Sequence, residues 1–194
     1  MDSELLNELR SQGTLNLEGK RIFGIAIPYN SVTDVGNGIS EVIRPGAMTD
    51  LLRSNPKIVA IQEHMGQYVL GSTTSGTLKL TDTPAGLAYE ITPPEGVSYI
   101  QDLMRSMEAN PGTFGSSFHM QLIRGGFTVT RTPSGGYLRD IKTISQCREI
   151  TITAFPCYTD SSAMLRSILA NEKPQDDGRP SAVVTYCEIR KRSL

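Results

Sequence analysis

The chain has few of the side chains on which metal centres and disulfide frameworks depend. Its 194 residues include three cysteines, Cys147, Cys157 and Cys187. This odd count without a CxxC pair argues against a disulfide framework and against a structural zinc site. There are two histidines, His64 and His119, so a histidine-rich metal centre is not available. We therefore expect no metal and no cofactor, and a reaction that needs an imidazole has two candidates.

An excess of positive charge is also absent, since 19 Lys and Arg residues stand against 20 Asp and Glu residues. Such a chain has no basic field to attract nucleic acid and no basic amphipathic stretch for a membrane surface. Its longest apolar runs are far shorter than a bilayer span, and its first residues lack the apolar core of a signal peptide. We expect a soluble protein made inside the cell, without nucleic-acid or membrane partners.

The length fits one ordinary domain with short extensions. Residues 1–20 are predicted to be an N-terminal extension with a short helix, and residues 21–170 the main domain. From residue 171 the chain becomes polar and contains Pro and Gly, so residues 171–194 are predicted to be a flexible tail. The alternative is an additional edge strand from Val183 to Cys187.

The main domain is predicted to be mainly β with some α (α+β). Apolar or alternating runs predict strands at residues 21–29, 39–43, 58–61, 76–80, 86–91, 113–120, 127–131, 137–141 and 147–156. Residues 97–107 and 161–169 have apolar side chains at helical spacing. Many short strands with a few helices around them indicate a closed or nearly closed β-barrel.

The predicted strand at residues 113–120 carries the candidate nucleophile. Side chains of a strand alternate between its faces, so Ser116 lies with Phe118, whereas Ser117 lies with His119. The face with Phe118 is interpreted as core. Ser117 is then expected to point into a cleft or solvent, although an ordinary half-buried strand gives the same pattern.

Two further polar residues would supply a base and an orienting acid for Ser117, although spacing alone does not select these three residues. His64 follows the predicted strand at residues 58–61, and Glu149 lies in an alternating strand. A serine hydroxyl needs an imidazole to take its proton, and the imidazole needs an acid to fix its tautomer. The alternative for His64 is an ordinary surface histidine in a loop.

Several segments together resemble the tailed-phage prohead maturation proteases. They occur in the order of that family and span roughly residues 21–165. The segments are FGIAIPY at residues 23–29, EVIRPGAM at 41–48, His64 with LG at 70–71, SG at 75–76, GL at 86–87, GSSF at 115–118, and REIT at 148–151 with Pro156 following.

The resemblance implies a serine endopeptidase with a fold similar to the herpesvirus assemblin barrel. It implies His64 as the base, Ser117 as the nucleophile and Glu149 as the third member, a position at which viral proteases of this fold differ. The resemblance implies the major capsid protein and the scaffold protein, or a scaffold-like extension, as partners. It also implies that the protease cleaves these partners and then cleaves itself. The implied place of action is the procapsid interior, in the host cytoplasm, and a homo-oligomer is compatible with this.

Several alternatives stay open at this point. The family often has a glycine where His119 stands, so His119 competes as base, although only His64 matches the motif. Cys147 and Cys157 are weaker candidates for the nucleophile, and the oxyanion is expected to bind backbone N–H groups, with Arg148 as a further donor. The alternative functions are a non-catalytic capsid-assembly or scaffold-associated protein on the same fold, and a hydrolase of a small ester or amide.

Overall fold

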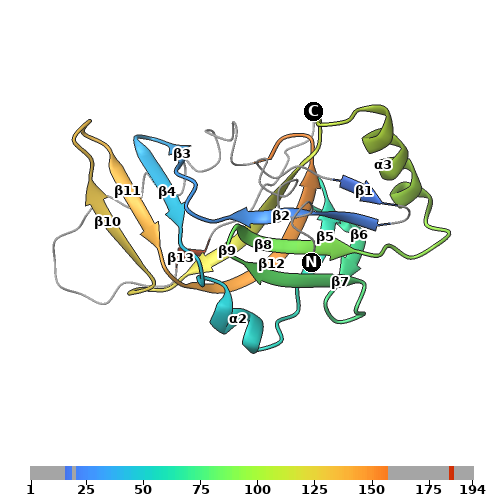
Figure 1. Ribbon diagram of the computed structural model, residues 1–194, viewed down its shortest axis with the longest axis horizontal. Helices are drawn as coiled ribbons and strands as arrows, with labels where there is room; N and C mark the ends of the chain where they lie inside the picture. Colours follow the sequence, from blue (N-terminus) through green and yellow to red (C-terminus); the bar gives the residue numbers. More distant parts are fainter. Residues whose placement is uncertain (1–15, 19–20, 157–183, 186–194) are drawn as a thin grey trace.

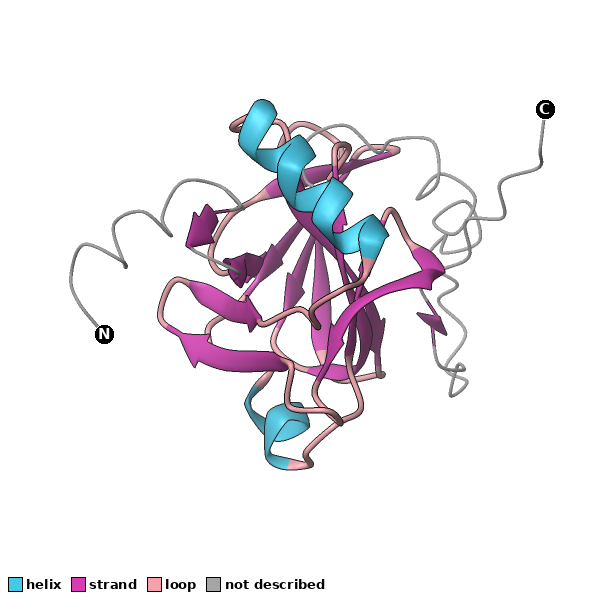
Figure 2. Ribbon diagram, turned by 90° about the vertical axis from the view of Figure 1, so that its right-hand side faces the viewer, coloured by secondary structure: helices cyan, strands magenta, loops and turns pink. Residues whose placement is uncertain are grey.

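Strands dominate the part of the chain that the computed structural model describes, residues 16–18, 21–156 and 184–185 (Figure 1). The strands are β1 (Asn16–Glu18), β2 (Arg21–Pro28), β3 (Thr33–Gly36), β4 (Ile39–Ile43), β5 (Val59–Gln62), β6 (Met65–Ser72), β7 (Leu78–Thr83), β8 (Gly86–Ile91), β9 (Gly115–Leu122), β10 (Phe127–Arg131), β11 (Tyr137–Ile141), β12 (Ile144–Thr153) and β13 (Val184–Thr185). The helices are α2 (Thr49–Arg53) and α3 (Ser98–Ala109). The two helices lie on opposite sides of the strands (Figure 2). Within the described residues, neither helix is long and apolar enough to cross a membrane.

The strands form three sheets, with the orders β1-β2-β8-β7, β10-β11-β4-β3 and β13-β9-β12-β5-β6. The sheet of β10, β11, β4 and β3 lies at the end of the molecule opposite α3 (Figure 1). One apolar core is shared by all three sheets, and Ile22, Ile91, Ile141 and Ile150 contribute fully buried side chains to it. The five-stranded sheet and the turn between its strands β5 and β6 hold His64, Ser117, His119 and Glu149.

The predicted closed or nearly closed barrel, similar to assemblin, is wrong. A barrel requires each strand to pair with a neighbour on both sides. Among the described residues, β1, β7, β10, β3, β13 and β6 are edge strands, so the three sheets are open. The turn between β6 and β7 shows the physical reason, because the backbone N–H of Ser72 bonds to the Thr77 hydroxyl and that of Thr73 bonds to the Ile58 carbonyl. These bonds give the backbone N–H groups at the turn their partners. Strands β6 and β7 therefore belong to different sheets and are not joined by backbone pairing.

Most individual elements are where the sequence pattern predicts them. The strands predicted at residues 76–80 and 86–91 form the antiparallel pair β7–β8, and those predicted at 127–131 and 137–141 form the antiparallel pair β10–β11. The helix predicted at residues 97–107 is α3, which buries Ile100, Leu103 and Met107. Strands β1, β3 and β6 were not predicted. The polar sequence of β3 resembles a loop, and its extended conformation depends on pairing with β4.

The predicted terminal segments fall largely outside the described residues. This applies to the helices expected within residues 1–20 and at residues 161–169. In the predicted tail, Val184 and Thr185 form β13, which pairs with Leu122 and Gln121 of β9. That pair corresponds to the alternative of an edge strand, whereas the division into extension, domain and tail stays a prediction.

Candidate active site

The neighbouring strands β9 and β12 bring Ser117 and Glu149 onto one face of the five-stranded sheet. In their antiparallel register Ser117 lies opposite Thr151, and His119 lies opposite Glu149. Residues directly opposite each other in a sheet point to the same side, as do residues two apart in one strand. These four side chains therefore share a face, although the two strands lie far apart in the sequence.

His64 reaches the same face from a two-residue turn between β5 and β6. Gln62 pairs with Met65, so Glu63 and His64 are the central turn residues, and their φ angles are 50° and 55°. Positive φ at both central positions is the geometry of a type I′ turn, which usually contains Asn-Gly. For residues other than glycine, this conformation costs about 1–2 kcal/mol each. The turn is therefore strained at the residue predicted to be the base.

His64 and Glu149 form a short hydrogen bond, with 2.6 Å between Nδ1 and Oε1. Burial raises the pKa of the Glu149 carboxyl, but the hydrogen bond and charge of His64, the charge of His119 and the hydrogen bond from Thr151 together outweigh it, and the resulting pKa is below the ordinary 4.5. An ionised carboxylate only accepts hydrogen bonds, so the Nδ1 proton of His64 is the donor. In the neutral ring, Nε2 then carries the lone pair that a general base needs. The Thr151 hydroxyl also donates to Glu149 Oε1, at 3.3 Å.

Ser117 is fully buried, with 0% of its surface exposed, and the prediction that it points into a cleft or solvent is wrong. The alternation rule assumes that one face of the strand is exposed to solvent. On β9, however, both Ser116 and Ser117 are buried, as are residues 119–122. Ser117 Oγ has no hydrogen-bond partner among the described residues. An unpartnered buried hydroxyl is rare, and one explanation for such a group is a catalytic role.

His119, the competing base, is also buried, and its Nε2 has no partner within the described part of the chain. Burial lowers the pKa of the His119 imidazole below its usual 6.5, Glu149 opposes this shift, and Arg148 and His64 add to it. His119 is therefore held in its neutral form. Its position opposite Glu149 places it beside the His64–Glu149 pair.

Cys147 and Ser116 have environments that do not favour nucleophilic attack. Burial raises the pKa of the Cys147 thiol to about 12, so it is not a thiolate at neutral pH. The Ser116 hydroxyl lies 2.8 Å from the hydroxyl of Tyr89 in the core. Arg148 is exposed on β12, and Cys157 lies outside the described residues.

Sequence reasoning missed two residues at this site. Thr151 donates to Glu149 and lies opposite Ser117, and spacing of two from Glu149 along a strand is the only signal that places it there. Glu63 bonds to the end of β12, and its one signal is that it precedes His64. In the described ranges, no group of three or more His, Cys, Asp or Glu side chains is arranged to hold a metal ion.

A family model described as Caudovirus prohead serine protease matches residues 7–174. No curated protein and no solved structure matches the chain. The matched range contains His64, Ser117 and Glu149 and covers most of the chain.

Proposed function

The chain belongs to the Caudovirus prohead serine protease family, and from this membership we propose that it is an endopeptidase whose Ser117, His64 and Glu149 perform acyl transfer. Membership implies a serine peptidase that acts in phage capsid maturation. The observation that carries the residue assignment is the 2.6 Å contact between His64 Nδ1 and Glu149 Oε1. It joins a base to an orienting acid on the sheet face that also holds Ser117.

In the proposed reaction, Ser117 Oγ attacks the scissile carbonyl carbon while His64 Nε2 accepts the hydroxyl proton. The tetrahedral intermediate collapses, the C–N bond breaks, and His64 returns that proton to the leaving amine. Water then attacks the acyl-enzyme with His64 again as base, which releases the carboxylic acid and restores Ser117. Glu149 keeps the Nδ1 proton in place and stabilises the imidazolium that forms in each half.

The negative oxygen of each intermediate needs hydrogen-bond donors. Backbone N–H groups near Ser117 are the proposed donors, with Arg148 as a further source of positive charge. The buried position of Ser117 supports this arrangement, because donors act more strongly where water is excluded.

The proposed substrates are scaffold protein, extensions of the major capsid protein, and the protease itself. These reactions would take place inside the procapsid, in the host cytoplasm. A non-catalytic capsid-assembly protein is the alternative function, and it has no need for a paired His64 and Glu149 beside an unpartnered serine.

The test is co-expression of the protein with the neighbouring capsid and scaffold genes. Wild type should shorten the capsid or scaffold protein on a gel, and Ser117→Ala should leave both at full length. Ser116→Ala is the matched control, because Ser116 is the adjacent residue but bonds to Tyr89 on the opposite face. Full processing by Ser117→Ala would assign the chemistry to another residue. Absence of processing by the wild type as well as by both variants would favour the non-catalytic alternative.

A further inference from the structure

The carboxylate of Glu63 binds the end of β12 through two hydrogen bonds. Oε2 accepts from the Thr153 hydroxyl at 2.7 Å, and Oε1 accepts from the backbone N–H of Ala154 at 2.9 Å. The backbone N–H of Glu63 donates to the carbonyl of Ile152 at 3.0 Å. Three bonds therefore join Glu63 to three successive residues, the last two of β12 and Ala154 directly after it.

The end of β12 to which Glu63 bonds also pairs with the part of β9 that carries Ser117. Thr153 lies opposite Gly115, and two residues earlier Thr151 lies opposite Ser117. A Cβ atom added to Gly115 would lie 2.8 Å from Pro156 Cγ, so the chain just after β12 packs closely against β9. Glu63 is thus bonded to the end of β12, the segment that pairs with β9 at Ser117.

The backbone of the turn needs such a tether. Non-glycine residues at positive φ persist where the surrounding structure determines their conformation, and here Glu63 and His64 are adjacent at 50° and 55°. The bond to Glu149 fixes which His64 nitrogen is protonated and one contact of the ring. The bond to Glu149 does not fix the backbone of His64. The hydrogen bonds of Glu63 to Ile152, Thr153 and Ala154 hold the backbone of the turn.

We propose that Glu63 is a positioning residue, whose carboxylate ties the strained turn to Thr153 and Ala154 and so sets the place of His64 relative to Ser117. The inference rests on the proposed role of His64 as the base. Glu63 touches no reacting atom in this scheme. Its contribution is to the geometry of proton transfer, in which a displacement of about 1 Å can cost about 100-fold in rate.

The experiment measures labelling of Ser117 by a fluorescent fluorophosphonate, as a function of probe concentration, in the full chain. Glu63→Gly removes the carboxylate and, because glycine adopts positive φ without strain, leaves a residue suited to the turn. The maximal labelling rate should fall about 10- to 100-fold, with the half-saturating concentration changed less than about twofold. Glu63→Gln keeps an oxygen acceptor for Ala154 and should lie between wild type and Glu63→Gly.

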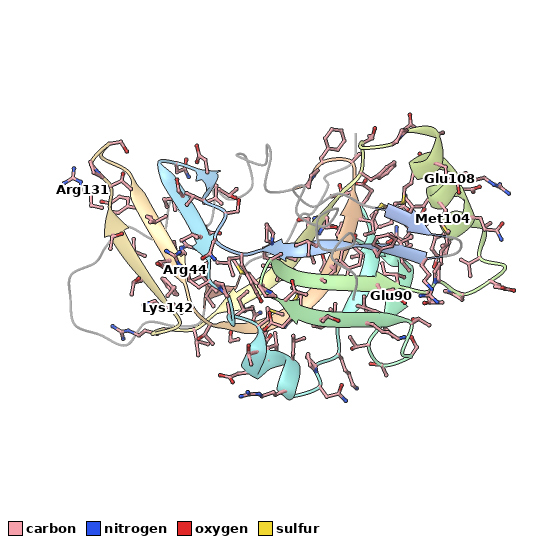
Figure 3. The ribbon with its side chains drawn as sticks, viewed as in Figure 1. Arg44, Glu90, Met104, Glu108, Arg131 and Lys142 are labelled. Carbon is pink, nitrogen blue, oxygen red and sulfur yellow. The ribbon has the colours of Figure 1, made fainter. Side chains whose placement is uncertain are left out.

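Two matched controls separate positioning from general effects. Asn55→Gly places glycine at another position of positive φ, 51°, in an exposed turn. Glu108→Gln removes an exposed carboxylate on α3, where Glu108 is labelled in Figure 3. Both should label at the wild-type rate. The His64 Nδ1 proton, followed by NMR, should broaden in Glu63→Gly and keep its wild-type signal in the controls.

The outcomes distinguish this inference from the proposed function. If His64→Ala labels like wild type, the assignment of the base is wrong, and the role of Glu63 falls with it. If His64→Ala is inactive while Glu63→Gly reaches the wild-type maximal rate, only the role of Glu63 is wrong. If Glu63→Gly fails to fold, Glu63→Gln decides: a reduced maximal rate supports positioning, and a wild-type rate contradicts it.

Discussion

His64 Nδ1 and Glu149 Oε1 lie 2.6 Å apart, although 85 positions separate the two residues in the chain. The contact arises because β5 and β12 are parallel neighbours in one sheet, with Val59 beside Glu149 and Gln62 beside Ile152. The turn after β5 then brings His64 back over β12. The proposed base and its proposed orienting acid are thus held together by two strands and one tight turn.

Replacing Glu149 by glutamine should reduce turnover strongly while substrate binding changes little. The glutamine side chain keeps the size of the original but lacks the charge that stabilises imidazolium, and its amide group can favour the wrong His64 tautomer. We expect a loss of about 1,000- to 10,000-fold in kcat, with KM within about threefold. Steady-state kinetics on a peptide from the processed substrate checks this, and full activity would remove Glu149 from the catalytic set.

Stability should fall between pH 7.5 and pH 5.5 in a way that depends on His119. Its folded pKa is lowered, first by burial, from the ordinary 6.5, so below that pH the unfolded chain binds a proton that the folded chain does not. The contribution of neutral His119 to the free energy of unfolding is therefore complete above its pKa in the unfolded chain. It is lost as the pH falls through its pKa in the folded chain. Urea unfolding of wild type and His119→Gln at both pH values measures it. The wild type should lose more stability on acidification than His119→Gln. An equal loss in both proteins would show that His119 does not cause the pH dependence.

The close packing of Gly115 against Pro156 predicts a stability effect near the nucleophile. A Cβ atom at residue 115 would lie 2.8 Å from Pro156 Cγ, so Gly115→Ala should destabilise by about 1–3 kcal/mol through overpacking. Gly66 is the matched control, because nothing lies within 4 Å of its added Cβ. Thermal unfolding should show a lower Tm for Gly115→Ala and little change for Gly66→Ala. Equal Tm values would mean that the two segments adjust without cost.

Truncation after Ala170 tests the predicted tail. The described contact of that region with the domain is the pairing of Val184 and Thr185 with β9 at its last two residues, away from Ser117. We expect the truncated protein to fold and to cleave in trans, and to fail to enter procapsids. Circular dichroism and an assembly assay measure the two properties. Unfolding of the truncated protein would show that β13 is required for the fold and would exclude a detachable tail.

The sequence predicts most strands, because these depend on alternation. Its three catalytic candidates come from residues that match motifs of the family, since spacing alone does not select them. It does not predict that Ser117 is buried, since burial depends on what covers both faces of β9. Nor does it predict that Thr151 lies opposite Ser117, because a register shift between Cys147 and Glu149 sets that pairing. The barrel was predicted wrongly for the same reason: strand patterns do not specify which edges pair, and here local bonds at the β6–β7 turn end one sheet and start another.

In the proposed mechanism His64 activates Ser117. Mass spectrometry of the protein after fluorophosphonate treatment tests it most directly, by identifying the labelled residue in wild type, His64→Ala and His119→Ala. We expect a single adduct on Ser117 in wild type, none in His64→Ala and a reduced amount in His119→Ala. An adduct on another serine, or labelling that is lost in His119→Ala but kept in His64→Ala, would contradict the account.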